Sequence, residues 1–117
     1  MPREGPLAIK VQLFAGEDRA FGPGRADVLA AIEREGSITA AGRSLGMSYR
    51  FTWNLVHSMN QCFREKLVDA ATGGKSGGSA ALTDAGRSVL TAYRALEAQV
   101  MNSAQGDALT GLCDLIR

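Results

Sequence analysis

The sequence predicts a mainly α-helical fold with one small β-hairpin, and three observations support this prediction. Apolar residues recur at helical spacing in successive segments after residue 24. A short turn that contains Gly46 joins two of these segments. A glycine-rich tract at 72–78 lies between two short strand-like runs, which is typical of a hairpin. This order of elements is that of a winged helix-turn-helix.

Length and composition limit the class of protein. The chain has 117 residues, which fits one domain over 1–117, and its first six residues (1–6) are expected to be disordered. No apolar run approaches the roughly 20 residues that a membrane span needs, and the N-terminus lacks the features of a signal peptide. Two cysteines, Cys62 and Cys113, are too few for a disulfide framework. We therefore expect a cytoplasmic protein that does not contact a membrane.

Positive charge collects in the middle of the chain. Residues 37–82 carry five basic and two acidic side chains, whereas 1–36 and 83–117 each carry one more acidic than basic side chain. A polyanion would therefore dock on the middle segment.

The first elements follow from simple patterns. Residues 7–14 show period-two alternation, which predicts a strand with one buried face. Residues 17–24 are polar and contain glycine and proline, which predicts a loop. A helix is predicted next, and Gly36 ends it. Its apolar positions are Val28, Leu29 and Ile32.

A short helix and a longer helix follow. Ser37 and Ser48 are placed to cap them, and Gly46 supplies the left-handed backbone of the turn between them. Met47 fills the core after the turn, and Gly42 allows the two helices to cross closely. The inward positions are Ile38, Ala41 and Leu45 in the short helix and Thr52, Val56, Met59 and Phe63 in the longer one.

The C-terminal part is predicted to contain a long helix over 83–104, capped by Thr83, and a short helix or tail over 107–117. So small a domain leaves the long helix little to pack against. We therefore favour a homodimer interface over an intramolecular core for its apolar stripe. That stripe is Val89, Tyr93, Leu96 and Val100.

The longer helix of the turn is the candidate recognition helix. Its outward stripe is Tyr49, Arg50, Trp53, Asn54 and His57. At the start of such a helix, arginine reads guanine and asparagine reads adenine in the major groove. Phe51 and Trp53 fit a core position equally well.

The glycine-rich tract has two interpretations. Gly74-Lys75-Ser76 matches the end of a P-loop, but Asp69 stands where that loop requires its first glycine. We therefore favour a wing whose backbone N–H groups and Lys75 contact DNA phosphates, with a merely flexible loop as the alternative.

A metal or redox site is a weaker hypothesis. His57, Met59 and Cys62 lie close along one helix, but His57 and Cys62 are five residues apart, which does not suit chelation by one helix face. No Ser/His/Asp, Cys/His or paired-carboxylate arrangement is evident. We therefore expect no enzyme activity, no cofactor and no metal site.

The sequence resembles one known family over roughly 7–102. The shared segments are 36–42, 45–50, Trp53, 59–60, 67–68, 71–75, 82–83 and 86–87. The family is the ModE family of molybdate-responsive bacterial transcription regulators, and the resemblance is to its N-terminal domain. It implies a winged-helix dimer in which Ser48, Tyr49 and Arg50 start the recognition helix and 72–75 lie in the wing.

Two departures from the family pattern matter. Ser76 and Ser79 interrupt a tract that is almost unbroken glycine in the family. The chain ends at Arg117, where the family continues into a separate molybdate-binding domain. Molybdate binding is therefore not expected within this chain.

The sequence thus predicts a bacterial transcription regulator that binds double-stranded DNA as a homodimer. The alternatives are a small metal- or redox-responsive sensor and a protein-interaction module on the same fold. The candidate DNA-binding residues are Ser37, Thr39, Arg43, Ser48, Tyr49, Arg50, Trp53, Asn54, Thr72, Lys75 and Ser76.

Overall fold

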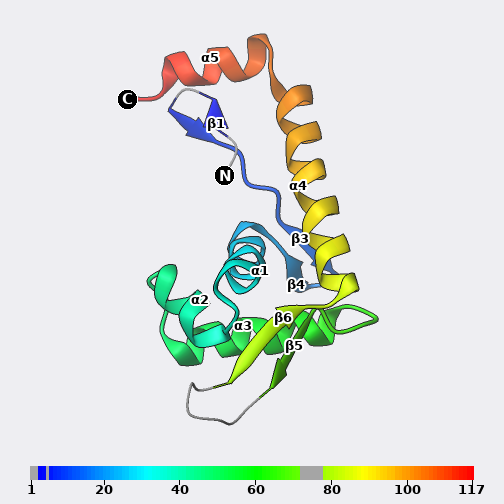
Figure 1. Cartoon of the computed structure of the whole chain (residues 1–117). Helices are drawn as coiled ribbons and strands as arrows, with labels where there is room; N and C mark the ends of the chain where they lie inside the picture. The colour runs from blue at the N-terminus through cyan, green and yellow to red at the C-terminus, as the bar shows by residue number, and fades with distance from the viewer. Residues whose placement is uncertain (1–2, 5, 72–77) are drawn as a thin grey trace.

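The computed structural model describes residues 3–4, 6–71 and 78–117. The helices within this part are α1 (Pro23–Glu35), α2 (Ile38–Ser44), α3 (Tyr49–Cys62), α4 (Asp84–Ala104) and α5 (Asp107–Leu115). The strands there form antiparallel pairs: β1 (Arg3–Glu4) with β2 (Leu7–Ala8), β3 (Leu13–Ala15) with β4 (Asp18–Phe21), and β5 (Val68–Ala71) with β6 (Ser79–Leu82). Figure 1 shows α1, α2, α3 and the β5–β6 pair gathered at one end of the molecule. The predicted winged helix-turn-helix is confirmed.

Residues 7–14 do not form the single strand that their alternation predicts. Strands β2 and β3 occupy only the two ends of this segment. Side chains hold the part between them: the hydroxyl of Tyr93 donates to the carbonyl of Val11 at 2.6 Å, and Gln12 Nε2 donates to the carbonyl of Phe21 at 2.9 Å. Tyr93 thus takes up a carbonyl that a continuous strand would offer to a neighbouring strand.

One other N-terminal prediction was wrong. Segment 17–24, predicted as a loop, contains β4, because Gly16 adopts a φ of +66° and turns the chain back from β3. Strand β1 lies within 1–6, where the sequence predicts disorder, and its backbone pairs with β2. Residues 1–2 and 5 lie outside the described part of the chain.

The helix caps follow the predicted pattern. The side-chain oxygens of Ser37, Ser48 and Thr83 each accept the backbone N–H three residues further on, at 3.0–3.1 Å. Gly36 and Gly46 adopt φ values of +80° and +71°, the left-handed conformation expected at the two turns. The boundaries of α1, α2 and α3 therefore arise from local sequence.

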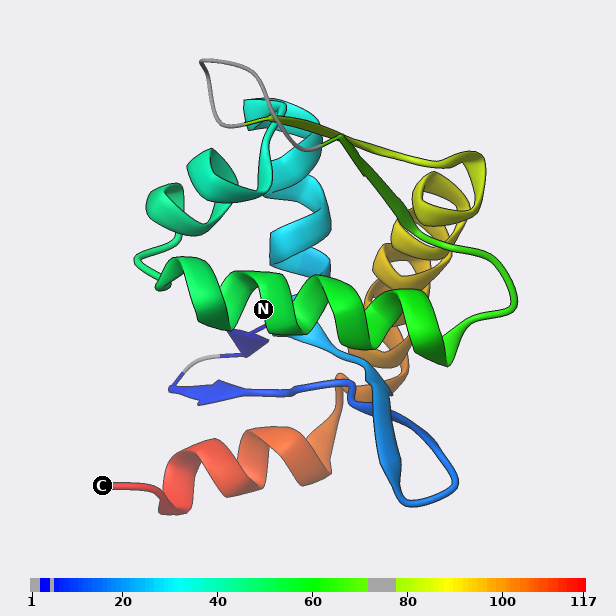
Figure 2. The same cartoon turned by 90° about the horizontal axis from the view of Figure 1, so that it is seen from below.

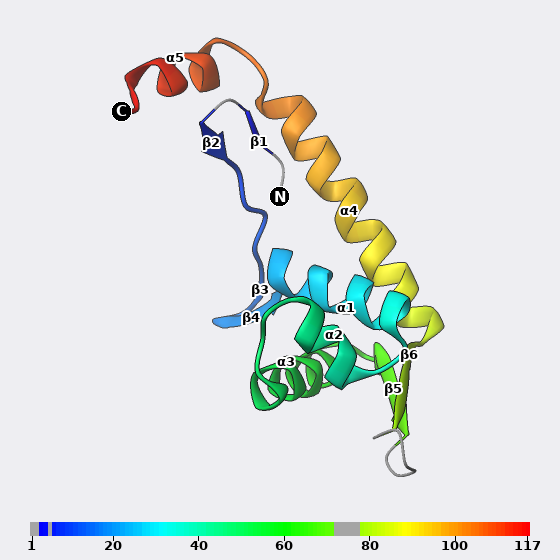
Figure 3. The ribbon, with the colours of Figure 1, turned by 60° about the vertical axis from the view of Figure 1, so that its left-hand side comes forward.

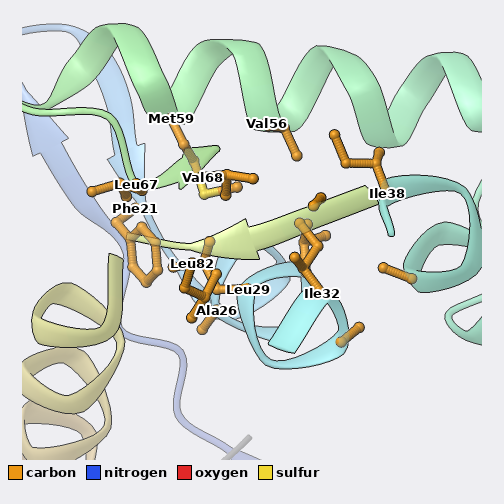
Figure 4. Packing of buried hydrophobic residues seen from close by; sticks show 14 of the residues in the cluster. Phe21, Ala26, Leu29, Ile32, Ile38, Val56, Met59, Leu67, Val68 and Leu82 are labelled. Atoms are coloured by element: carbon orange, nitrogen blue, oxygen red, sulfur yellow. The ribbon is translucent and has the colours of Figure 1, made fainter. Parts of the chain in front are cut away.

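The core lies between α1, α3 and the β5–β6 pair. In Figure 4, Val56 and Met59 extend from α3 toward the strands, and Leu29 and Ile32 of α1 lie on the other side of Leu82. The predicted inward residues that are buried are Val28, Leu29, Ile32, Ile38, Ala41, Thr52, Val56 and Met59. Leu45 and Phe63 are partly buried against the same core.

Helices α2 and α3 cross closely at Gly42. This residue is buried, and a Cβ atom added to it would collide with Oγ1 of Thr52. The Thr52 hydroxyl donates to the carbonyl of Ser48 at 2.8 Å, and the N–H of Met47 donates to the carbonyl of Gly42 at 2.9 Å. The turn between the two helices is therefore closed by direct hydrogen bonds.

The base of the hairpin is tied to the helices. The N–H of Ala80 donates to the carbonyl of Gly36 at 2.9 Å. Asn60 of α3 reaches across to the start of β5: its Oδ1 accepts the N–H groups of Leu67 and Val68 at 2.9 and 3.1 Å, and its Nδ2 donates to the carbonyl of Val68 at 3.1 Å. These bonds fix the direction of the hairpin relative to α3.

Helix α4 starts at the core and then extends away from it toward α5, as Figure 3 shows. The molecule is accordingly elongated, with extents of 55 × 29 × 24 Å. Tyr93, predicted to lie in a dimer interface, is only 2% exposed and packs edge-on against Phe21 with ring centroids 5.0 Å apart. Burial raises the pKa of Tyr93 to about 12, and the nearby Glu97 carboxylate adds to this effect. Tyr93 is therefore a core residue of its own chain.

Replacing Gly42→Ala should lower the free energy of unfolding by about 1–3 kcal/mol, because the new Cβ forces the buried Thr52 to move. Gly111→Ala in α5 is a matched control, because its added Cβ meets nothing within 4 Å and alanine favours a helix by up to about 1 kcal/mol. Urea denaturation measures both effects. Equal stability of the two variants would contradict the close crossing.

Replacing Tyr93→Phe should change the response of stability to alkaline pH. Because the folded chain raises the pKa from 10.0 to about 12, folding favours the protonated phenol. Its contribution is therefore complete below pH 10 and is lost as pH rises through 12. Urea midpoints measured across this window should fall more steeply for the wild-type chain than for the variant, and parallel curves would show that Tyr93 makes no such contribution.

Candidate nucleic-acid interface

Helix α3 presents a face that no other described element covers. Arg50, Asn54 and His57 are exposed on it, opposite the buried Thr52, Val56 and Met59. Figure 2 views the molecule from this side, with α3 lying across the front. Arg50 takes part in no ion pair within the described residues, so its guanidinium is available to a ligand. Of the predicted outward stripe, four residues are thus exposed, Tyr49, Arg50, Asn54 and His57, whereas Trp53 is not.

Tyr49 and Trp53 lie on the flank of α3 that faces the β5–β6 pair. Trp53 Nε1 donates to the hydroxyl of Tyr49 at 2.5 Å, which links the two rings across one helical turn. Tyr49 is 57% exposed, whereas Trp53 is half-buried and packs against the core. Part of the Trp53 side chain therefore packs against the core, and the rest stays at the surface.

Phe51 is 52% exposed, so the core interpretation does not hold for this residue. It lies on the opposite flank of α3 from Trp53, beside the start of α1, where it lines a surface hollow together with Leu55. Phe51 thus adds exposed apolar surface beside the polar face that carries Arg50 and Asn54.

Four other predicted residues surround the N-terminal end of α3. Ser37 and Thr39 line a small hollow between α2, α3 and the β5–β6 pair, together with Tyr49 and Trp53. Ser37 and Ser48 accept N–H groups at the helix starts, which leaves each hydroxyl hydrogen free to donate outward. Arg43, exposed in the last turn of α2, forms no ion pair among the described residues.

The predicted wing-tip contacts Thr72, Lys75 and Ser76 lie outside the described residues. The strands on either side of this tip are described, and Ala70, Ala71 and Ser79 line the same hollow as Tyr49. The tip-side ends of β5 and β6 are therefore next to the N-terminal half of α3.

Sequence reasoning missed two polar residues that extend the protruding face. Gln61 is exposed one helical turn beyond His57, and Lys66 follows the end of α3. Both line a hollow that also contains Trp53 and His57. The signal was available for Gln61, because 50, 54, 57 and 61 are spaced as one face of a helix.

His57 and Cys62 are both exposed, and the described part of the chain contains no group of three or more His, Cys, Asp or Glu side chains placed to hold a metal ion. Within that part, none of the helices combines the length and apolar character that crossing a bilayer requires.

Comparison with known proteins agrees with this geometry. A family described as bacterial regulatory helix-turn-helix protein, lysR family, matches residues 25–87, which run from the first turn of α1 to the first turn of α4. The molybdenum-pterin-binding protein MopB of Rhodobacter capsulatus is 49% identical over 80 residues, covering 68% of this chain and 30% of the relative.

Two further relatives carry the name ModE. The molybdenum transport protein ModE of Azotobacter vinelandii is 42% identical over 79 residues, covering 68% of this chain and 29% of that protein. The DNA-binding transcriptional dual regulator ModE of Escherichia coli K12 is 38% identical over 106 residues, covering 89% of this chain and 38% of that protein. The chain thus spans about a third of the length of these curated relatives. The resemblance to ModE is confirmed, and the chain belongs to the lysR family of bacterial regulatory helix-turn-helix proteins.

Proposed function

We propose that the chain is a ModE-like transcription regulator that binds double-stranded DNA as a homodimer, with α3 in the major groove and the β5–β6 hairpin along the phosphate backbone. The protruding face of α3 is the observation that carries this proposal. Arg50, Asn54, His57 and Gln61 lie exposed on one side of a helix whose other side is held by the core. A major groove about 12 Å wide accepts one helix with its side chains.

The residues divide into two roles. Arg50 and Asn54 lie in the first two turns of α3, where side chains reach base edges, and they suit guanine and adenine respectively. The hydroxyls of Ser37 and Ser48 and the guanidinium of Arg43 suit phosphate oxygens around the same helix end. For the wing tip, Thr72, Lys75 and Ser76 are proposed from the sequence to contact phosphates.

An apolar hollow supports the homodimer. Its volume is about 210 Å³, and its walls come from β3, β4, the end of α3 and helix α4. The residues lining it are Leu13, Phe21, Phe63, Val89, Ala92, Tyr93 and Leu96. Leu13 and Leu96 leave apolar surface exposed around Tyr93, which is itself buried. A second copy would remove this surface from water, and a two-fold dimer would present its two α3 helices to half-sites about 34 Å apart.

Replacing Arg50→Ala should weaken binding to the best operator far more than binding to random DNA. A bidentate contact to a base is worth about 1–3 kcal/mol of discrimination.

Replacing Lys75→Ala should weaken binding to both DNAs alike, because a phosphate contact is blind to sequence. It should also lower the slope of log affinity against log salt by about one for each phosphate that is no longer neutralised. Fluorescence anisotropy at several salt concentrations measures both quantities.

Arg117→Ala is the control for these variants. Arg117 is exposed at the C-terminal end of the chain, which Figure 1 places far from α3, so its removal should change neither quantity. Arg94 does not suit this purpose, because it is tied to Asp27 at 3.1 Å and to Glu97 at 3.0 Å. If Lys75→Ala relaxed specificity while Arg50→Ala weakened all sequences equally, the proposed roles of helix and wing would be reversed.

Replacing Leu96→Asp should convert the dimer into monomers, because a carboxylate buried in an apolar interface is costly. Gln99→Asp, exposed on the same helix, adds the same charge and should leave the dimer intact. Analytical ultracentrifugation gives the oligomeric state, and circular dichroism verifies that each variant is folded. A folded Leu96→Asp variant that sediments as a dimer would place the interface elsewhere on the molecule.

A further inference from the structure

A groove borders α3 on the flank opposite the β5–β6 pair. Figure 3 shows β4 and the start of α1 on this side of α3, and the β5–β6 pair on the other. The groove has a volume of about 390 Å³. Its apolar wall includes Phe51 and Leu55 of α3, and its polar wall includes Lys10, Arg19 and Arg25. Three cations from three successive segments, the stretch between β2 and β3, strand β4 and helix α1, thus line the groove beside the proposed recognition helix.

The groove has a net positive charge. Asp27 also lines it, but its carboxylate is bound to Arg94 at 3.1 Å and is directed to α4. Asp18 lines the adjoining hollow, which shares Arg19 and Arg25 with the groove. Lys10 and Arg19 form no ion pair with any described residue. One or two negative oxygens of a ligand would therefore find uncompensated positive charge here.

Arg25 is held in place but is not fully satisfied. Its Nη2 donates to Oγ of Ser58 in α3 at 3.1 Å, which fixes the guanidinium between the two helices. Its Nε is buried and has no hydrogen-bond partner among the described residues. A buried N–H without an acceptor is costly, so a ligand oxygen that reached it would gain free energy.

The backbone at the start of α1 adds to the same wall. This helix begins at Pro23 after Gly22, with no side-chain cap, so the N–H groups of Gly24 and Arg25 have no partner within the helix. Gly22, Pro23 and Gly24 line the groove together with the three cations. Unpaired N–H groups beside guanidinium groups suit the oxygens of a phosphate.

The position of the groove indicates which phosphate it would meet. A helix in the major groove has a sugar–phosphate backbone on each of its flanks. In the proposed complex the wing borders one backbone, and this groove borders the other. We propose that the groove binds a phosphate-type oxyanion, supplied by the DNA backbone on the side of α3 opposite the wing. This inference rests on the proposed DNA-binding function.

The first arm of the test measures DNA binding. Lys10→Ala and Arg19→Ala remove exposed side chains that hold no other described element in place, and thermal unfolding verifies their folds. Each substitution should lower the affinity for operator DNA and for random DNA by the same factor. Each should also lower the slope of log affinity against log salt by about one for every phosphate that loses its cation in each protomer. Arg117→Ala should leave the slope unchanged. An unchanged slope in both groove variants would overturn the proposed backbone contact.

The second arm uses inorganic phosphate without DNA. At constant ionic strength, phosphate should shift the amide resonances of Gly24 and Arg25 in the wild-type chain more than chloride does, and Arg19→Ala should reduce the shift. Shifts with unchanged DNA salt slopes would mean that the groove takes a free oxyanion instead of the DNA backbone. Absence of both effects would overturn the site. If the wild-type chain bound no DNA at all, the proposed function would fail, while the phosphate titration would still test the groove.

Discussion

The close contact between α2 and α3 determines how the exposed face of α3 is presented. Gly42 of α2 lies so near Thr52 of α3 that no side chain fits between them, and Thr52 is fully buried there. With Thr52 fixed inward, the helical period turns Arg50 and Asn54 outward. The same contact sets the Gly46 turn, because the N–H of Met47 reaches back to Gly42. The outward face of α3 is thus a consequence of packing on its inward face.

A second contact sets the hairpin relative to that face. The amide of Asn60 bonds to both N–H groups at the start of β5 and to the carbonyl of Val68, so the end of α3 and the start of the hairpin form one unit. A helix that reads bases needs phosphate contacts at a fixed distance from it. Here the side chain of Asn60 sets the position of the hairpin relative to α3. Within α3, Asn60 is half-buried beside the core stripe, and its amide holds the start of the hairpin.

Local sequence predicted the parts of the fold that local forces determine. The caps at Ser37, Ser48 and Thr83, the left-handed glycines and the buried stripe of α3 all follow from spacing within one or two turns. The alternation over 7–14 misled because a side chain remote in sequence, that of Tyr93, binds the carbonyl of Val11 in the middle of this segment. Tyr93 itself fits an apolar helical stripe, and no pattern within α4 could show that Phe21 covers its ring. Periodicity within one segment could not predict these contacts between distant segments.

The distribution of charge at the candidate site shows the same limit of prediction from the sequence. By sequence, positive charge collects in 37–82, and the segment before it is slightly acidic. The fold changes this distribution, because it pairs an acidic group of the N-terminal segment with a cation of another segment: Asp27 binds Arg94 of α4. Arg19 and Arg25 are left facing the flank of α3. The positive surface beside α3 thus includes cations outside the helix and the hairpin, because ion pairing within the fold decides which cations of an acidic segment stay available.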